Sequence, residues 1–345
     1  MRAFDRAGIT RDDLDALVLT DQDAFDGAAI SSGMKVTPAG GYEKPVMRIQ
    51  NGGGAGIHQA VAKIRAGKAD VVSVVAADTV QTEHRMVSHI SQEPLYARPI
   101  GQDHLQSYGI LTNAHLERRD VTVDDLARTA AKNYTAASEN PTAHRREQYT
   151  KADICESDTV VGPLRELMIG PVSYGAAVLI LVSEEKAAEL SIDPVWLTGI
   201  GINSSQYGYR DFDERLNQPA LRSAAKAAYE GAGIKPSDVD AAEIAGPTPS
   251  FELLGYEALG FCDNGDGATL LRNGVTAPDG DLPVNLSGGP LATNPPNAGG
   301  IYRTIAAAQA IKDVGADRVV VADNDLHLGE PGRTDAVLVL EGGAS

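Results

Sequence analysis

The chain has 345 residues, of which 43% are hydrophobic, and carries a formal net charge of −17 at pH 7. This length and composition suit one large globular domain or two medium ones, and the charge argues against nucleic acid or an anionic membrane as a partner. The two cysteines, Cys155 and Cys262, lie far apart, which argues against a disulfide framework or a structural zinc site. Because no run of 18 uncharged apolar residues occurs and Met1 leads into a charged amphipathic helix, we expect a cytoplasmic protein without a membrane span.

The first predicted unit is a strand, a glycine-rich elbow and a helix. Residues 48–60 read RIQNGGGAGIHQA, with the strand over 46–49, the elbow over 52–56 and a helix that runs to about Arg65. Such an elbow commonly presents a phosphate, a nucleotide or a nucleophile. This elbow contains no Ser, Cys or Lys, and GGGAG departs from the GxGxxG pattern of dinucleotide sites.

A polar and mostly helical region follows at about 80–165. It contains a predicted helix within residues 121–141, which ends at an Asn-Pro pair, and it is followed by a strand predicted at 176–183. A second half of the chain begins near Trp196. Four histidines of this region lack the spacing of a metal site, so we expect no metal and place them at the surface. They are His84, His89, His104 and His115.

Two pairs of segments repeat in the same order. Residues 4–19 and 229–244 each end a helix at Ala-Gly and enter an apolar strand after a short polar link. Residues 56–76 and 300–322 each form a glycine-opened helix followed by Ala-Asp and a Val-rich strand. Continuous apolar strands of this kind are typical of sheets covered on both faces. A common helix-to-strand junction would explain one pair, but two pairs in order favour a duplicated, layered α/β architecture.

Three segments then carry a resemblance to a known family. Residues 162–185 contain PVSYGAA, residues 245–271 contain GFC followed by GDG, and residues 284–312 contain NLSGG with a glycine-opened helix. These motifs resemble the thiolase superfamily, and within it the lipid-transfer-protein (sterol-carrier-protein) branch. The resemblance spans almost the whole chain.

The resemblance implies an α/β thiolase fold. It predicts duplicated βαβαβαββ halves in five layers, with the N-terminal half trimmed at its start, since the usual first strand and helix are missing or shortened. The halves are expected over 1–190, including the helical insertion at about 80–165, and over 191–345. It also implies a dimer and a coenzyme A thioester site at the carboxyl ends of the strands, with no covalently bound cofactor.

Two family landmarks lack their reactive groups. Members of the family carry a nucleophilic cysteine at the elbow, but here Gln50, give or take one residue, takes that position, and an amide is not a nucleophile at neutral pH. The family's His-Pro motif is replaced by Asn294-Pro295 or by Pro295-Pro296, so its histidine is missing. An asparagine can donate a hydrogen bond to an oxyanion but cannot act as a base.

Two further landmarks are also changed. The loop that carries an acid/base cysteine in degradative thiolases here contains His327, preceded by Asp323, Asn324 and Asp325. An unperturbed imidazole titrates near neutrality, so His327 is a candidate acid or base, although a solvated loop histidine is the alternative. The fourth landmark retains only polar candidates, which are Glu243, Thr248, Ser250 and Glu252.

Two functions remain open, and we favour the enzyme. The first is a thiolase-like acyltransferase or aldolase without the nucleophilic cysteine, which cleaves a β-hydroxyacyl-CoA by a retro-aldol reaction or transfers an acyl group with a partner subunit. The second is a catalytically degenerate subunit that binds acyl-CoA or supports an active partner chain. The candidate catalytic residues are His327, Tyr174, Tyr302 and Asn294, with packing as the alternative role for both tyrosines. The candidate thioester-binding residues are Gln50, Asn51, Gly52, Gly53, Gly288 and Gly289.

The resemblance also suggests partners. We expect a dimer of this chain with itself or with another thiolase-like chain. Members of this branch often work with a small zinc-ribbon/OB-fold protein, so such a partner is a further expectation.

Overall fold

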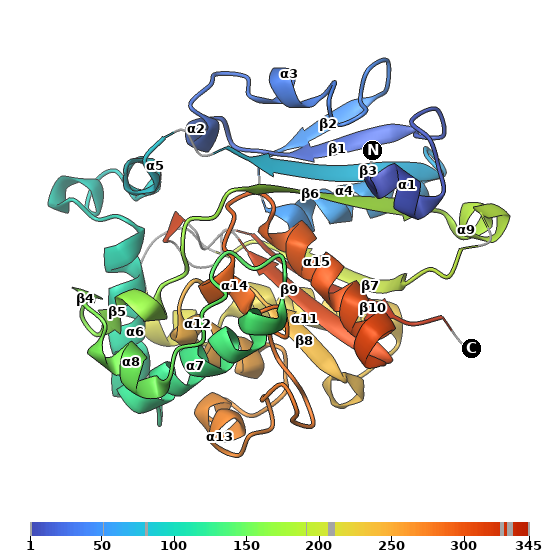
Figure 1. The fold of residues 1–345 in the computed structure, drawn as a ribbon. Helices are drawn as coiled ribbons and strands as arrows, with labels where there is room; N and C mark the ends of the chain where they lie inside the picture. The colour runs from blue at the N-terminus through green and yellow to red at the C-terminus, as the bar shows by residue number, and fades with distance from the viewer. Residues whose placement is uncertain are drawn as a thin grey trace.

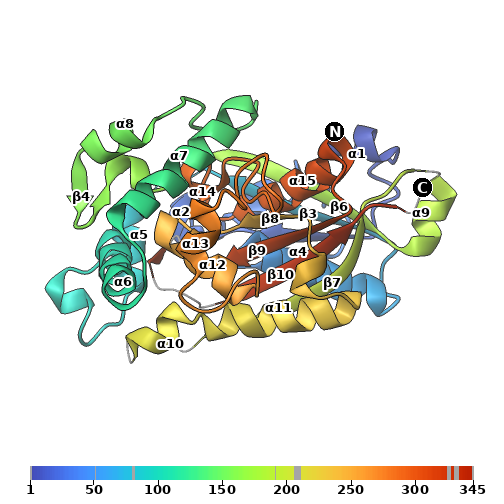
Figure 2. The same cartoon turned by 90° about the horizontal axis from the view of Figure 1, so that it is seen from below.

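The computed structural model describes residues 2–50, 52–79, 82–190, 192–205, 211–324, 328–329 and 334–343. Two four-stranded sheets lie face to face with two central helices between them (Figure 1). The outer face of each sheet is covered by further helices, as the view from below also shows (Figure 2). This is the five-layer arrangement that the sequence predicts. The strands at the centre of each sheet are buried on both faces, as their continuous apolar runs indicate, whereas three of the edge strands are only partly buried.

The first sheet has the strand order β2-β1-β3-β6. Strands β1, β2 and β3 run parallel, and β6 pairs antiparallel with β3. Each side chain of β1 is buried, which explains the uninterrupted apolar run in the sequence. The strands are β1 (Ala16–Thr20), β2 (Val46–Ile49), β3 (Val71–Asp78) and β6 (Gly175–Val182).

The second sheet has the order β7-β10-β9-β8. Strand β8 is parallel to β9, while β10 is antiparallel to both β9 and β7. The strands are β7 (Trp196–Asn203), β8 (Ala241–Ile244), β9 (Arg318–Asn324) and β10 (Asp335–Glu341).

The duplication read from the sequence is confirmed by the pairing. The central helices α4 (Gly53–Arg65) and α15 (Gly299–Gln309) come from the second repeated pair, and each leads into the strand at the centre of its own sheet, β3 or β9. A parallel bridge between Ala242 and Val284 takes the place that the β1–β2 pairing has in the first half. Strand β7 has no counterpart beside β6 among the described residues.

The remaining elements cover the sheets and build the insertion. Outside the central pair and the insertion, the helices are α1 (Arg2–Ala7), α2 (Asp23–Asp26), α3 (Ser32–Lys35), α9 (Glu184–Leu190), α10 (Phe212–Leu216), α11 (Pro219–Ala232), α12 (Pro249–Ala258), α13 (Gly267–Arg272) and α14 (Gly289–Ala292). The insertion holds α5 (His84–Ser91), α6 (His104–Arg118), α7 (Val123–Glu139), α8 (Lys151–Glu156) and the small strands β4 (Thr159–Val161) and β5 (Leu164–Arg165). Within the described residues, no helix has the length and apolar character needed to cross a membrane.

The expected surface position is wrong for two of the four histidines. His104 and His115 are buried on α6, and the His104 ring stacks on that of His84 with centroids 4.2 Å apart. The two residues are eleven positions apart, about three helical turns, so they share the inward face of α6. The spacing of the histidines in the sequence could not reveal this burial, because it arises from packing of α6 against other elements, among them α5, α10 and α12.

His115 gives a testable stability prediction. Its side chain is fully buried, and neither ring nitrogen has a hydrogen-bond partner among the described residues. Burial, with a smaller effect of Arg119, lowers the pKa of His115 to about 4. The free energy of unfolding therefore has a contribution that is present above the unfolded pKa, about 6.5, and is lost as pH falls through 4.

We expect His115→Leu to raise the free energy of unfolding by about 1 kcal/mol at pH 7, since it removes an unsatisfied buried polar group. It should also remove roughly 3 kcal/mol of acid-induced loss between pH 6.5 and 4. Urea unfolding at several pH values measures both effects, with the exposed His144→Leu as the control. Equal acid sensitivity of the His115 variant and the wild type would contradict the prediction.

Candidate active site

The glycine-rich elbow lies where the N-termini of two helices meet. Helices α4 and α15 begin side by side, and a Cβ atom at Gly53 would overlap the backbone nitrogen of Ile301. Gly300 is equally constrained, because its Cβ would overlap the carboxylate of Asp323 and approach the nitrogen of Gly54. The glycines are therefore required for the close approach of the two helix N-termini, which accounts for the run GGGAG without any phosphate.

A buried ion pair lies at this junction. Asp323, at the end of β9, accepts a hydrogen bond from the Gly54 nitrogen at 2.7 Å through Oδ2. Its other oxygen pairs with the guanidinium of Arg303 on α15, and both side chains are almost completely buried. Gly299 leaves room for that guanidinium, since its Cβ would lie 3.0 Å from Nη2. A carboxylate at a helix N-terminus is favoured by the helix dipole, so Asp323 caps α4.

The first half caps the central helix of the second half in the same way. Asp78, at the end of β3, accepts hydrogen bonds from the backbone nitrogens of Asn297 at 2.9 Å and Ala298 at 2.9 Å, and from the Asn297 side chain at 2.6 Å. Ala298 is the N-cap residue of α15. Each half thus ends its central strand in an aspartate that caps the central helix of the other half. Burial raises the pKa of Asp78 to about 6, although these hydrogen bonds act to lower it.

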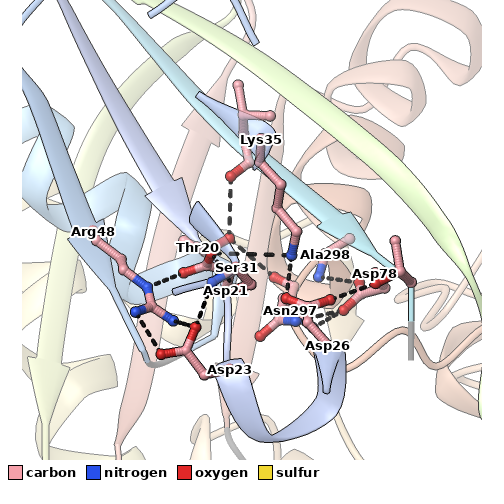
Figure 3. Close-up of polar contacts among 12 residues, drawn as sticks. Thr20, Asp21, Asp23, Asp26, Ser31, Lys35, Arg48, Asp78, Asn297 and Ala298 are labelled. Carbon is pink, nitrogen blue, oxygen red and sulfur yellow. Dashed lines mark hydrogen bonds and ion pairs between the residues drawn. The ribbon is translucent and has the colours of Figure 1, made fainter. Parts of the chain in front are cut away.

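The strand ends of the first sheet are filled by charged side chains (Figure 3). Arg48, four residues before the elbow, pairs with Asp21 and Asp23. Lys35 pairs with Asp26, and the Lys35 Nζ lies 4.0 Å from Asp21 Oδ2. The hydrogen bond from Arg48 lowers the pKa of Asp23 to about 2. These cations and carboxylates neutralise one another, so we interpret this end of the sheet as structural.

A small pocket, with room for about one water molecule, lies at the junction on the side of the second half. It is lined by residues 245–247 after β8, by residues 294–296, and by Arg303, Asp323 and Asn324. Three of the four family landmarks therefore face one pocket, and the fourth, the elbow, reaches it through the hydrogen bond from Gly54 to Asp323. The chemistry that the pocket offers is hydrogen bonding and proton transfer, since the ionisable groups among its described lining residues are one carboxylate and one guanidinium.

The structure brings some of the predicted site residues together. Asn294 lines the pocket, with its backbone nitrogen held at 3.0 Å by the hydroxyl of Ser173. Tyr174 directly follows that serine, but its own side chain is 61% exposed. Tyr302 precedes Arg303 on α15, and its hydroxyl accepts a hydrogen bond at 2.7 Å from Asn140 at the end of α7.

The predicted thioester-binding residues separate into two groups. Gly52 and Gly53 are buried at the start of α4, whereas Gln50 is exposed. The nitrogen of Gly288 donates to the carbonyl of Asn285 at 2.8 Å, and that of Gly289 donates to Ser287 Oγ at 3.2 Å. These two NH groups are thus engaged inside their own loop. Asn51 and His327 lie outside the described residues.

Sequence reasoning missed Arg303 and gave Asp323 only as a neighbour of His327. A signal for Asp323 was present, because the repeated Val-rich strands both end in aspartate, at Asp78 and Asp323. Nothing in the local sequence marks Arg303, whose partner lies 20 residues further along the chain.

Neither cysteine supplies a nucleophile. Cys262 follows α12, where burial and the nearby Glu257 raise the pKa of its thiol to about 12. Cys155 packs against the same hydrophobic core from α8, and neither cysteine lines the pocket. The thiolate, which is the reactive form, is therefore not available at the junction.

A second buried carboxyl lies beneath the Ser-Gly-Gly loop. Glu243 on β8 accepts hydrogen bonds from the backbone nitrogen and the hydroxyl of Ser287, at 2.9 and 2.6 Å. Burial raises its pKa to about 7 despite these bonds. A raised pKa means that the folded state binds a proton that the unfolded state, with a pKa near 4.5, has released. The resulting stabilisation is fully present below pH 4.5 and is lost as pH rises through 7.

We expect Glu243→Gln to remove this pH dependence. Between pH 5 and 7.5 the wild type should lose up to about 3 kcal/mol of unfolding free energy relative to the variant. Urea unfolding at the two pH values measures the difference, and Glu117→Gln on the exposed face of α6 is the matched control. Parallel pH profiles for the wild type and Glu243→Gln would show that the prediction is wrong.

Comparisons with known proteins agree with this arrangement. The family described as thiolase C-terminal domain-like matches residues 204–340. The acetyl-CoA acetyltransferase of Methanothermobacter thermautotrophicus is 28% identical over 296 residues, which cover 83% of this chain and 77% of that protein. Sterol carrier protein 2 of Homo sapiens is 28% identical over 227 residues, which cover 63% of this chain but only 40% of that protein. Among solved structures, the Ltp2-ChsH2(DUF35) aldolase superposes with a TM-score of 0.83 at 22% identity, covering 99% of this chain and 91% of the other.

Proposed function

Because this chain belongs to the thiolase superfamily and lies on its sterol-carrier-protein-like branch, we propose that it binds an acyl-CoA thioester and cleaves a carbon–carbon bond without a covalent intermediate. The reaction is the retro-aldol cleavage of a β-hydroxyacyl-CoA. A base removes the β-hydroxyl proton, the bond between Cα and Cβ breaks, and the thioester enolate is protonated at Cα. The products are a shorter acyl-CoA and a ketone or aldehyde.

One observation carries this proposal. Among its described lining residues, the pocket has a hydrogen-bond donor, Asn294, and a carboxylate, Asp323, but no thiol or hydroxyl nucleophile. Such groups can stabilise an enolate oxygen and move a proton, whereas acyl transfer through the protein needs a nucleophile that can be acylated. His327, Tyr174 and Tyr302 remain candidates for the same proton transfers. The similarity in fold to a protein named as an aldolase supports the same choice.

We extend the proposal to partners. The solved relative in the comparison is named as a complex of two proteins, so we propose that this chain also works with a second chain. That chain is a further thiolase-like subunit, with a dimer of this chain as the simplest case, or a small zinc-ribbon/OB-fold protein. The partner would deliver the thioester to the pocket. This chain alone would then be less active than the complex.

A second candidate function has its own support. The donors that would hold a thioester oxygen are engaged within the chain, since Gly54 donates to Asp323, and Gly288 and Gly289 donate inside their loop. In an acyl-CoA-binding subunit that catalyses no reaction, such NH donors could all be engaged in hydrogen bonds within the chain. Its role would be to support an active partner chain.

Product analysis distinguishes the two candidates. The full chain, with any chain that co-purifies, is incubated with β-hydroxyacyl-CoAs of increasing acyl length, and products are identified by mass spectrometry. The aldolase predicts equal amounts of a shorter acyl-CoA and a carbonyl compound, with loss of both in Asn294→Ala. If the complex cleaves thioesters equally well with Asn294→Ala, the second candidate replaces the first.

A further inference from the structure

The two capping aspartates are related by the duplication, but their surroundings differ. Asp78 receives three hydrogen bonds from Asn297 and Ala298, and it does not line the pocket. Asp323 receives one backbone NH and one guanidinium, and it lines the pocket beside residues 294–296. A carboxylate has about four acceptor sites, so Asp323 retains capacity for a further partner on its pocket side.

The residues around Asp323 fix the position of its carboxylate. Two glycines, Gly54 and Gly300, are required for its carboxylate, because a Cβ at either residue would lie against it. Arg303 pairs with the carboxylate oxygen that Gly54 does not contact, and Arg303 is itself 4% exposed. Groups that are fixed in this way before a substrate binds reduce the reorganisation that proton transfer requires.

We propose that Asp323 is the proton-transfer group of the pocket, with Arg303 as its positioning residue. The proposal rests on the function proposed above. The Asp323 carboxylate takes the proton of the β-hydroxyl group, the electrons of the broken bond remain on Cα as the thioester enolate, and the Asp323 carboxylic acid returns the proton to Cα. The Asn294 side chain, in the same pocket, donates to the enolate oxygen.

Proton exchange at acetyl-CoA tests the assignment without knowledge of the natural substrate. The enolate step in reverse removes an α-proton from acetyl-CoA, and the carboxylic acid then exchanges with solvent. In D2O the wild-type protein, with any co-purifying chain, should therefore introduce deuterium at the α-carbon, detected by mass spectrometry. Asp323→Asn keeps the shape and the acceptor for Gly54, and we expect it to lower the exchange rate at least about 100-fold.

The twin residue is the control. Asp78→Asn removes the equivalent charge from the other half and should retain exchange within a few-fold of the wild type, even if its melting temperature falls. If Asp323→Asn fails to fold, Gly300→Ala displaces the carboxylate without deleting it and should also slow exchange. Acetyl-CoA affinity, measured by calorimetry, should be similar in wild type and Asp323→Asn, since a proton-transfer role affects the rate and not binding.

The outcomes separate the inference from the function on which it rests. Exchange by the wild type that persists in Asp323→Asn overturns the assignment and leaves the aldolase function intact. Equal losses in Asp78→Asn and Asp323→Asn would also overturn it, because a purely structural role then explains both. No exchange by the folded wild-type protein that binds acetyl-CoA would overturn the proposed enolate chemistry itself.

Discussion

Replacement of Arg303 by methionine is expected to lower the free energy of unfolding by about 3–5 kcal/mol, because it leaves the Asp323 carboxylate buried without its cation. The remaining hydrogen bond from Gly54 does not compensate for a full charge in the interior. Urea unfolding at pH 7 measures the loss. The effect is large because the pair lies where the N-termini of α4 and α15 meet, so both central helices depend on it.

Two controls make the result specific. The exposed pair between Arg128 and Asp124 on α7 should contribute little, and Arg128→Met is expected to change stability by less than about 1 kcal/mol. The double variant Arg303→Met with Asp323→Asn removes both charges and should be less destabilised than Arg303→Met alone. If Arg303→Met and Arg128→Met are equally mild, the buried pair does not stabilise the junction.

Replacement of Asn294 by alanine is expected to reduce the turnover of a β-hydroxyacyl-CoA by about 10²–10³-fold, since it removes the side-chain donor proposed for the enolate oxygen. The loss should appear in kcat more than in KM, because charge on that oxygen develops mainly in the transition state. Steady-state kinetics with the wild type and the variant measure this division.

Asn273→Ala, at the exposed end of α13, is the matched control and should leave both constants unchanged. Asn294→Asp would place a second carboxylate beside Asp323 and should be at least as harmful as alanine. If Asn294→Ala leaves kcat unchanged, Asn294 takes no part in the reaction, and the function as an acyl-CoA-binding subunit is favoured.

The layered fold could be predicted because its signals are local and repeated. Continuous apolar runs identify β3 and β9, and the helix within residues 121–141 is confirmed as α7 with its end at Glu139. In each case a short window of sequence contains the period, the cap or the break that determines the element.

The site could be predicted only in part, for a physical reason. Gly54 and Asp323 are 269 residues apart in the sequence, and their contact depends on how the two halves pack. The elbow glycines suggested a platform for a ligand, whereas the structure explains them by the close approach of two helices. The burial of His104 and His115 was missed for the same reason, since it arises from packing between elements and not from spacing within one.

The most direct test of the account is the mass of the intact chain during turnover. The full chain, with any co-purifying chain, is mixed with a β-hydroxyacyl-CoA that it cleaves, quenched in acid at short times and analysed by mass spectrometry. Because the described lining of the pocket contains no thiol or hydroxyl nucleophile, we predict that the carbonyl product accumulates while the mass of the chain stays unchanged. A chain that becomes heavier by the mass of the acyl group, at a rate sufficient for turnover, would contradict the account.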